Sequence, residues 1–145
     1  MTQCRRSFIN SMFLFMLAGL PRVGRGRLKL EIDDKLTTAM VRETKGGKVT
    51  ASGLVKLDAP DIAEDGSIVP ITIESELPGV ESIWVFVEKN PSPLAARFDL
   101  EKSLDAFVSL RIKMNESCKV IAMVKSEGGY FSASKQVTVV TGGCG

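Results

Sequence analysis

The clearest candidate for chemistry in this 145-residue chain is a cysteine one position before its last residue. The sequence ends Val139-Val140-Thr141-Gly142-Gly143-Cys144-Gly145, so an apolar segment runs straight into a glycine-rich arm that carries one thiol. Because glycine adds flexibility and removes side-chain bulk, Gly142, Gly143 and Gly145 are expected to let the Cys144 thiol enter a narrow active site of another protein. Four residues at about 3.4 Å each give this arm a reach of roughly 14 Å.

The sequence lacks the side chain that most often activates such a thiol. Histidine is absent, which excludes a Ser-His or Cys-His nucleophile and any histidine metal ligand. A thiol without such help is a poor catalyst, but it can carry a covalently attached group to enzymes that supply the chemistry. Two alternatives remain open: Cys144 forms an interchain disulfide in an exported interaction module, or it is incidental on a fraying tail.

Other signs of an enzyme are missing from the sequence. It has no cluster of metal ligands, no phosphate-binding glycine loop and no acid/base pair with a recognisable spacing. Asp58, Asp61, Glu64 and Asp65 suggest calcium, but they lack the regular one-three-five ligand pattern and its closing glutamate. We expect these acids to solvate a loop, and we expect a protein that is not an enzyme and holds no metal or cofactor.

The two remaining cysteines have different expected fates. Cys4 lies in an N-terminal leader and leaves with it. Cys118 shares a strand face with Val120, Ala122 and Val124, which favours a small buried core residue. A disulfide with Cys144 or an interchain bridge is the alternative for Cys118 in an oxidising compartment.

The first residues of the chain have the layout of an export signal. Paired Arg5 and Arg6 precede an uninterrupted apolar stretch, Met12 to Leu20, and the pair resembles the twin-arginine consensus that exports folded proteins. The stretch is too short to span a membrane, and no cysteine follows it to carry a lipid anchor. We place the end of the leader near Gly26 and expect a periplasmic protein, exported by the twin-arginine route or by an ordinary secretory signal.

The charge of the chain is unevenly distributed. Residues 1–30 hold six basic residues and no acid, whereas residues 31–145 hold 13 basic and 17 acidic residues. A mildly acidic body without a basic patch argues against nucleic acid as a partner. Its length and apolar fraction predict a single packed domain.

The body begins with a helix and continues as strands. Apolar positions at helical spacing predict a helix over residues 28–45, ended by Gly46-Gly47. Beyond it the apolar period changes to two. The expected strands are residues 54–57, 69–74, 83–87, 96–100, 108–113, 118–124 and 130–140, the last two joined by the turn Glu127-Gly128-Gly129.

Seven short strands with almost no helix between them predict an all-β fold, an immunoglobulin-like antiparallel β-sandwich. A barrel of similar strand number is the competing fold. The strand at residues 83–87 is apolar on both faces and should be covered on each side. Pro70 lies inside a predicted strand, which marks that strand as an edge or a bulge because proline donates no ladder hydrogen bond. An exposed edge is also a docking surface for a second chain.

Several stretches of residues 28–145 resemble the SoxY family, the sulfur-carrier subunit of the thiosulfate-oxidising Sox system. They are Leu57 to Gly66, Val69-Pro70-Ile71, Lys89-Asn90-Pro91, Arg111-Ile112-Lys113 and Thr141 to Gly145. Their order, together with the glycine-cysteine terminus, is specific. Family members carry two glycines after the cysteine, whereas this sequence has Gly145 alone.

The resemblance implies that residues 27–145 form a sulfur-carrier domain with a flexible arm. Cys144 would be the thiol to which a haem-containing enzyme conjugates thiosulfate, and Gly142, Gly143 and Gly145 would supply flexibility. Hydrolytic and oxidising Sox enzymes would then process the sulfur while it stays bound to Cys144. The implied partner is SoxZ, a second small β-sandwich that forms a heterodimer with the carrier.

Overall fold

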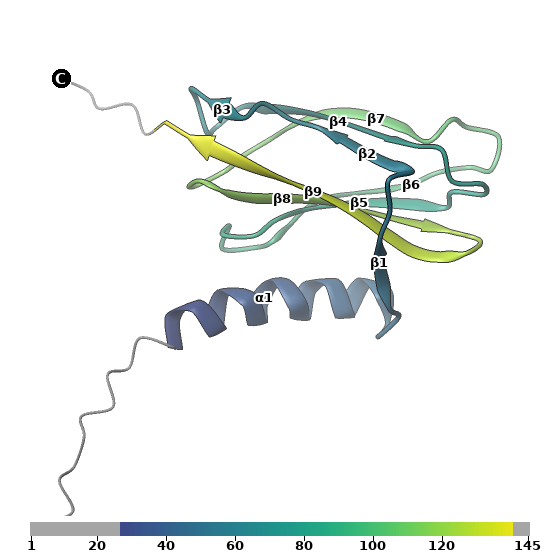
Figure 1. Ribbon diagram of the computed structural model, residues 1–145, viewed down its shortest axis with the longest axis horizontal. Helices are drawn as coiled ribbons and strands as arrows, with labels where there is room; N and C mark the ends of the chain where they lie inside the picture. The colour runs from purple at the N-terminus through teal and green to yellow at the C-terminus, as the bar shows by residue number, and fades with distance from the viewer. Residues whose placement is uncertain (1–26, 141–145) are drawn as a thin grey trace, which may run out of the picture.

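A computed structural model describes the backbone of residues 27–140 and the side chains of residues 35–140. This part of the chain contains one helix and nine strands (Figure 1). In chain order they are α1 (Arg27–Thr44), β1 (Val49–Ala51), β2 (Val55–Asp58), β3 (Ile62–Ala63), β4 (Val69–Ser75), β5 (Ser82–Val87), β6 (Leu94–Asp99), β7 (Phe107–Ile112), β8 (Cys118–Ser126) and β9 (Gly129–Val139). The expected leader, with Arg5 and Arg6, lies outside the described residues.

The strands form two sheets that face each other, and α1 lies on the outer face of the larger sheet (Figure 1). The larger sheet has the strand order β1-β9-β8-β5-β6, with β3 also paired to β9, and the smaller sheet has the order β2-β4-β7. The pairs β2–β4, β4–β7, β5–β6, β5–β8 and β8–β9 are antiparallel. The predicted all-β, immunoglobulin-like sandwich is therefore confirmed.

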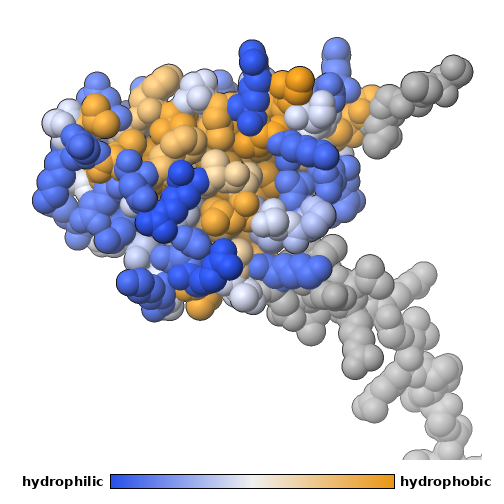
Figure 2. Space-filling view, turned by 180° about the vertical axis from the view of Figure 1, so that it is seen from behind, coloured by the Kyte–Doolittle hydropathy of each residue, from blue (hydrophilic) through white to orange (hydrophobic). Residues whose placement is uncertain are grey.

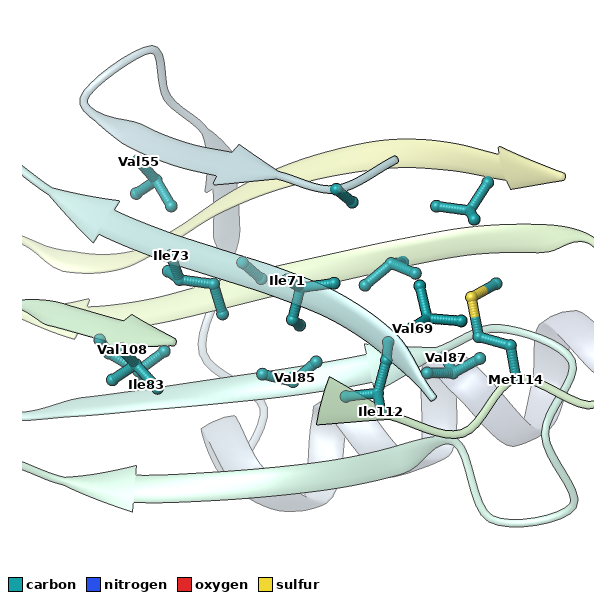
Figure 3. Close-up of a cluster of buried hydrophobic side chains, with 14 of the residues drawn as sticks. Val55, Val69, Ile71, Ile73, Ile83, Val85, Val87, Val108, Ile112 and Met114 are labelled. Atoms are coloured by element: carbon teal, nitrogen blue, oxygen red, sulfur yellow. The ribbon is translucent and has the colours of Figure 1, made fainter. Parts of the chain in front are cut away.

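Strand β5 is buried on both faces, as its apolar sequence predicts. Ile83, Val85 and Val87 belong to the core between the sheets. Figure 3 shows that core, in which the side chains of β5 lie opposite those of β4 and β7. The alternate residues Trp84 and Phe86 belong to a second apolar cluster beneath α1. A strand covered by a sheet on one side and a helix on the other has no face left for polar residues.

Helix α1 closes the second cluster with one apolar face. Leu36, Ala39 and Met40 pack against Trp84, Phe86 and Met123 of the sheet. The helix ends where the sequence predicts, because Lys45 and Gly46 adopt positive φ angles of 52° and 83°, and the Gly46 amide donates to the carbonyl of Val41 at 3.1 Å.

A polar network holds the end of α1 against the same sheet. The indole Nε1 of Trp84 donates to Oε2 of Glu43 at 3.1 Å, and Arg97 of β6 reaches the same carboxylate at 3.4 Å. The Arg97 guanidinium also lies over the Trp84 ring, 5.6 Å from its centroid. These contacts fix the helix at one orientation in addition to its apolar packing.

Two short strands depart from the antiparallel pattern expected from the sequence. β1 and β3 both pair in parallel with β9. The chain crosses to the smaller sheet at β2 between them, so β1 and β3 return to the same edge in the same direction. Strands of three and two residues are too short to show the apolar alternation on which the sequence prediction depends.

The structure refines the prediction for Pro70. Its strand, β4, is the middle strand of the smaller sheet. However, β2 pairs with β4 only from Thr72 onward, so Pro70 has β7 as its only neighbour strand within the described part of the chain. The edge character predicted for proline therefore applies to the segment around Pro70 and not to the whole strand.

Candidate functional site: the base of the C-terminal arm

The predicted carrier residue, Cys144, and the arm glycines Gly142, Gly143 and Gly145 lie outside the described residues. The structure does place the point at which the chain enters the arm. Strand β9 ends at Val139, and Val140 is the last described residue, at one end of the sandwich (Figure 1). We call the residues around this point, Ile62 to Ile68, Lys113 to Ser117 and Val139 to Val140, the arm base.

The backbone of β9 is held from both sides up to its last residues. On one side, the amides of Thr138 and Val140 donate to the carbonyls of Asp61 and Ala63, each at 2.9 Å. On the other side, Ser117 Oγ accepts from the amide of Val139 at 2.8 Å and lies 3.3 Å from the Val139 carbonyl, to which it donates. The Ser117 side chain thus takes the place of a strand partner where the β8–β9 ladder ends. The origin of the arm is consequently fixed at Val140.

Replacing Ser117 with alanine should loosen this anchor. The change removes both hydrogen bonds to Val139, and we expect the Val139 amide to exchange with solvent roughly 5-fold faster, which corresponds to about 1 kcal/mol. Native-state hydrogen exchange measures the effect, with Ser92→Ala, an exposed serine, as the control. Unchanged exchange at Val139 in Ser117→Ala would show that the hydroxyl does not anchor β9.

A hollow of about 490 Å³ lies beside the arm origin. Its lining includes Gly66, Met114, Val139 and Val140. Gly66 has no room for a side chain, because a Cβ there would lie 2.5 Å from the Met114 carbonyl oxygen and 2.7 Å from Cγ1 of Val139. The Met114 amide also donates to the Gly66 carbonyl at 2.7 Å. Glycine at position 66 therefore lets two loops meet directly beneath the last residues of β9.

The surface of the arm base combines apolar and charged side chains. Ile62, Ile68 and Val140 are large apolar residues with about half or more of their surface exposed. The carboxylate of Asp65 accepts the Ser67 amide at 2.8 Å, and hydrogen bonds from Ser67 lower the pKa of Asp65. Asp65 therefore stays charged at neutral pH. The surface around the arm origin therefore combines exposed apolar side chains with acidic, basic and polar ones.

Asn90 ties a second loop to the arm base. Its amide Nδ2 donates to the Lys113 carbonyl at 2.7 Å, and its Oδ1 accepts the Asn115 amide at 3.1 Å. The sequence assigned Gly66 and Asn90 a part in the family resemblance but no structural role in the arm base. It gave no signal for Ser117, because a single serine between strands has many equivalent uses.

Cys118, next to Ser117, is buried as predicted. Only 1% of its surface is exposed, and it packs in the core between the sheets with Val120 and Val137. It is a free thiol among the residues that the structure describes, and burial raises its pKa. A buried, protonated thiol is a poor nucleophile, so Cys118 does not compete for chemistry.

Replacing Cys118 with serine should destabilise the domain without touching the arm. A hydroxyl would be buried among apolar side chains without an assured partner, which costs roughly 1–3 kcal/mol. Urea unfolding followed by Trp84 fluorescence measures the change, and Cys118→Ala is the control that adds no polar atom. Equal unfolding midpoints for wild type and Cys118→Ser would contradict the core assignment.

The described residues show no other chemical centre. Over residues 35–140, no three His, Cys, Asp or Glu side chains are placed to hold a metal ion. No helix in the described part of the chain is long and apolar enough to cross a membrane. Asp58 ends strand β2, whereas Asp61, Glu64 and Asp65 lie in the segments that flank β3, and all four acids are exposed.

Comparisons with known proteins agree with this geometry. The family model "Sulfur oxidation protein SoxY" matches residues 41–144, a range that includes Cys144. The solved structure of the sulfur carrier protein SoxY from Chlorobium limicola f thiosulfatophilum is 30% identical, with a TM-score of 0.68, and the match covers 74% of this chain and 98% of that one.

A variant of the superoxide reductase (neelaredoxin) from Ignicoccus hospitalis shares the fold at 17% identity. Its TM-score is 0.54, with 61% of this chain and 82% of that chain covered. At this identity the likeness concerns the sandwich alone. A search of curated proteins found no match.

Proposed function

The chain belongs to the SoxY family of sulfur oxidation proteins, and we propose that it carries intermediates of thiosulfate oxidation covalently on Cys144. The observation that carries this proposal is the family match, which extends through Cys144. The described structure supports it in one further respect. The chain is anchored up to Val140 by hydrogen bonds on both sides of β9, which leaves the thiol four residues beyond a fixed point.

The proposed loading step is an oxidative conjugation. The thiol of Cys144 and thiosulfate form a sulfur–sulfur bond, giving the protein S-thiosulfonate, one proton and two electrons, which the haem-containing partner accepts. In the next step, a hydrolytic partner adds water to the terminal sulfonate. This releases sulfate and one proton and leaves a persulfide on Cys144, which a further partner oxidises.

This chain contributes the thiol to which the sulfur is attached, and its partner enzymes catalyse the reactions. Without histidine in the sequence, Cys144 depends on each visiting enzyme for the electrostatics that activate it. The arm base fits brief docking, because Ile62, Ile68 and Val140 surround the arm origin with exposed apolar surface that can contact the entrance of an enzyme cleft.

We further propose that the carrier works in the periplasm as a heterodimer with a SoxZ-like subunit. The basis for the compartment is the Arg5-Arg6 leader, since twin-arginine export moves folded proteins. Export in the folded state would carry a cofactor-free complex of the carrier and its subunit across together. Hydrolytic and haem-containing Sox enzymes would then act on the assembled carrier.

The test is the intact mass of the exported chain, purified without reductant from cells grown on thiosulfate. The carrier function predicts a single-chain mass increased by sulfur or thiosulfate, with the increase lost on reduction. A mass of two chains that reduction halves, without sulfur adducts, would instead identify Cys144 as an interchain disulfide and overturn the proposal.

A further inference from the structure

Most edges of the two sheets are protected against pairing with another chain. β1, β2 and β3 are only three, four and two residues long, and β2 exposes the charged residues Lys56 and Asp58. β6 is irregular, because its register with β5 shifts between Val85 and Phe86. Short strands, charges and bulges are the usual devices that prevent an edge from accepting a further strand.

β7 is neither short nor bulged, and Arg111 is its one charged residue. It pairs with β4 in one regular register over six residues, from Phe107 to Ile112. It contains no proline, and its inward positions, Val108, Leu110 and Ile112, are all apolar. A regular edge of this length with an apolar inner face is a template for one more strand.

The register shows which backbone groups of β7 are free. Ser75 donates to the carbonyl of Ala106, directly opposite, at 2.9 Å. Hydrogen-bonded and non-hydrogen-bonded pairs alternate along an antiparallel ladder. Because Ala106 and Ser75 form a hydrogen-bonded pair, every second residue from Ala106, namely Val108, Leu110 and Ile112, also bonds to β4. The amides and carbonyls of Ser109 and Arg111 therefore point away from β4, and no partner for them exists among the described residues.

The side chains beside this edge leave apolar surface exposed. Phe107 and Leu104 are 55% and 60% exposed, and Leu110 of β7 and Phe98 of β6 are only partly buried. Figure 2, which views the molecule from the side on which β6 and β7 are the edges, shows hydrophobic surface across the middle of the domain. A hollow of about 460 Å³, lined by Pro70 of β4 and by Ser109, Leu110 and Arg111 of β7, lies at the end of the smaller sheet where Pro70 pairs with Arg111.

The charge of this side indicates the chemistry of its occupant. Arg111 is exposed, and no side chain in residues 35–140 forms an ion pair with it. A second copy that paired antiparallel with β7 through the free groups of Ser109 and Arg111 would place Arg111 opposite Phe107 or Ser109, depending on the register. Neither guanidinium would then gain a carboxylate, so an acidic partner fits this edge better than a second copy does.

We propose that β7 is the docking edge for a different protein chain, which adds a β-strand to the smaller sheet. That strand would be apolar where it meets Val108 and Leu110 and would carry an acidic side chain opposite Arg111. The C-terminal end of β7, Ile112, directly precedes Lys113 of the arm base, so a chain bound along β7 would lie next to the arm base. This inference rests on the proposed function in one respect only: the SoxZ-like subunit is the binding partner used in the test.

The test uses the full chain and its SoxZ-like subunit. Ser109→Pro removes the free amide and places a ring against the incoming strand, while leaving the bonds to β4 intact, and should weaken binding roughly 30-fold. Ser109→Ala keeps the amide and should bind like wild type. Arg111→Glu should weaken binding roughly 10-fold at low salt. In the wild-type complex, the amides of Ser109 and Arg111 should exchange roughly 100-fold more slowly than in the free chain.

Wild-type affinity in both Ser109→Pro and Arg111→Glu, or unprotected amides in the complex, would overturn the β7 interface. If Ser109→Pro does not fold, two measurements still test the interface. They are the hydrogen exchange of the wild-type complex and the affinity of Arg111→Glu. Disulfide-linked dimers of a Ser109→Cys, Cys144→Ala chain would also overturn it in favour of a second copy, since facing residues of such a pair lie about 5.5 Å apart. Sulfur loading of Cys144 is measured in parallel. If wild type is not loaded, the proposed carrier function is contradicted, but the proposed β7 interface is not.

Discussion

Replacing Cys144 with alanine should reduce thiosulfate-dependent electron transfer to the haem-containing partner to the background rate. The reason is stoichiometric, because every intermediate of the proposed cycle is bonded to this sulfur. Thermal unfolding of Cys144→Ala should match wild type, since residue 144 lies four positions beyond Val140, whose amide is the last one that the structure shows bonded to the sandwich. A reconstituted system with thiosulfate and the partner enzymes measures the effect.

The matched control is Cys118→Ala, which removes the buried cysteine of the sandwich. Its thiol is buried in the core, so loading and electron transfer should continue in every folded molecule. Electron transfer that persists in Cys144→Ala and disappears in a folded Cys118→Ala would contradict the proposal. It would show that Cys118, and not Cys144, is the carrier thiol.

Replacing Phe86 with alanine should destabilise the domain more than either substitution at Cys118. Its side chain is fully buried between the larger sheet and α1, with Trp84 and Met123 beside it. Removing a buried phenylalanine costs about 3–5 kcal/mol, because the transfer free energy is lost and a cavity remains. Urea unfolding gives the difference in the free energy of unfolding.

Phe107→Ala is the matched control for this prediction. Phe107 is 55% exposed, so the same truncation should change the stability of the isolated chain by no more than about 0.5 kcal/mol. Similar losses for the two variants would contradict the assignment of Phe86 to a second core beneath the helix.

The general fold could be predicted because its strongest determinants are local. The run from Ile83 to Val87 is apolar on both faces, and the structure covers it with a sheet on one side and α1 on the other. The apolar face of α1 and the glycines that end it are equally visible in the sequence. Cys118 could be assigned to the core because its strand neighbours two and four positions away are also apolar.

The details of the arm base could not be predicted, because they depend on contacts between distant segments. Ser117 meets Val139, and Gly66 meets Met114, only after the sheets have formed. The parallel pairing of β1 and β3 with β9 arises from the crossing of the chain between sheets, which leaves no periodic pattern in two or three residues. The free edge of β7 likewise follows from strand order and register.

The division of labour in the molecule follows from this arrangement. The sandwich and α1 provide a body whose last strand is held on both edges. Under the proposed function, a thiol four residues beyond this fixed point would have a high effective concentration at a docked active site. Such a carrier needs a well-anchored arm origin more than it needs reactive groups of its own.

The central claim is that Cys144 alone holds the sulfur. The most direct measurement incubates the purified chain with thiosulfate and the haem-containing partner, and then locates the added mass on peptides analysed without reduction. We predict a reductant-sensitive thiosulfate adduct on the peptide that contains Cys144 and an unmodified peptide around Cys118. Absence of any adduct on Cys144 while the partner accepts electrons from thiosulfate would contradict the account.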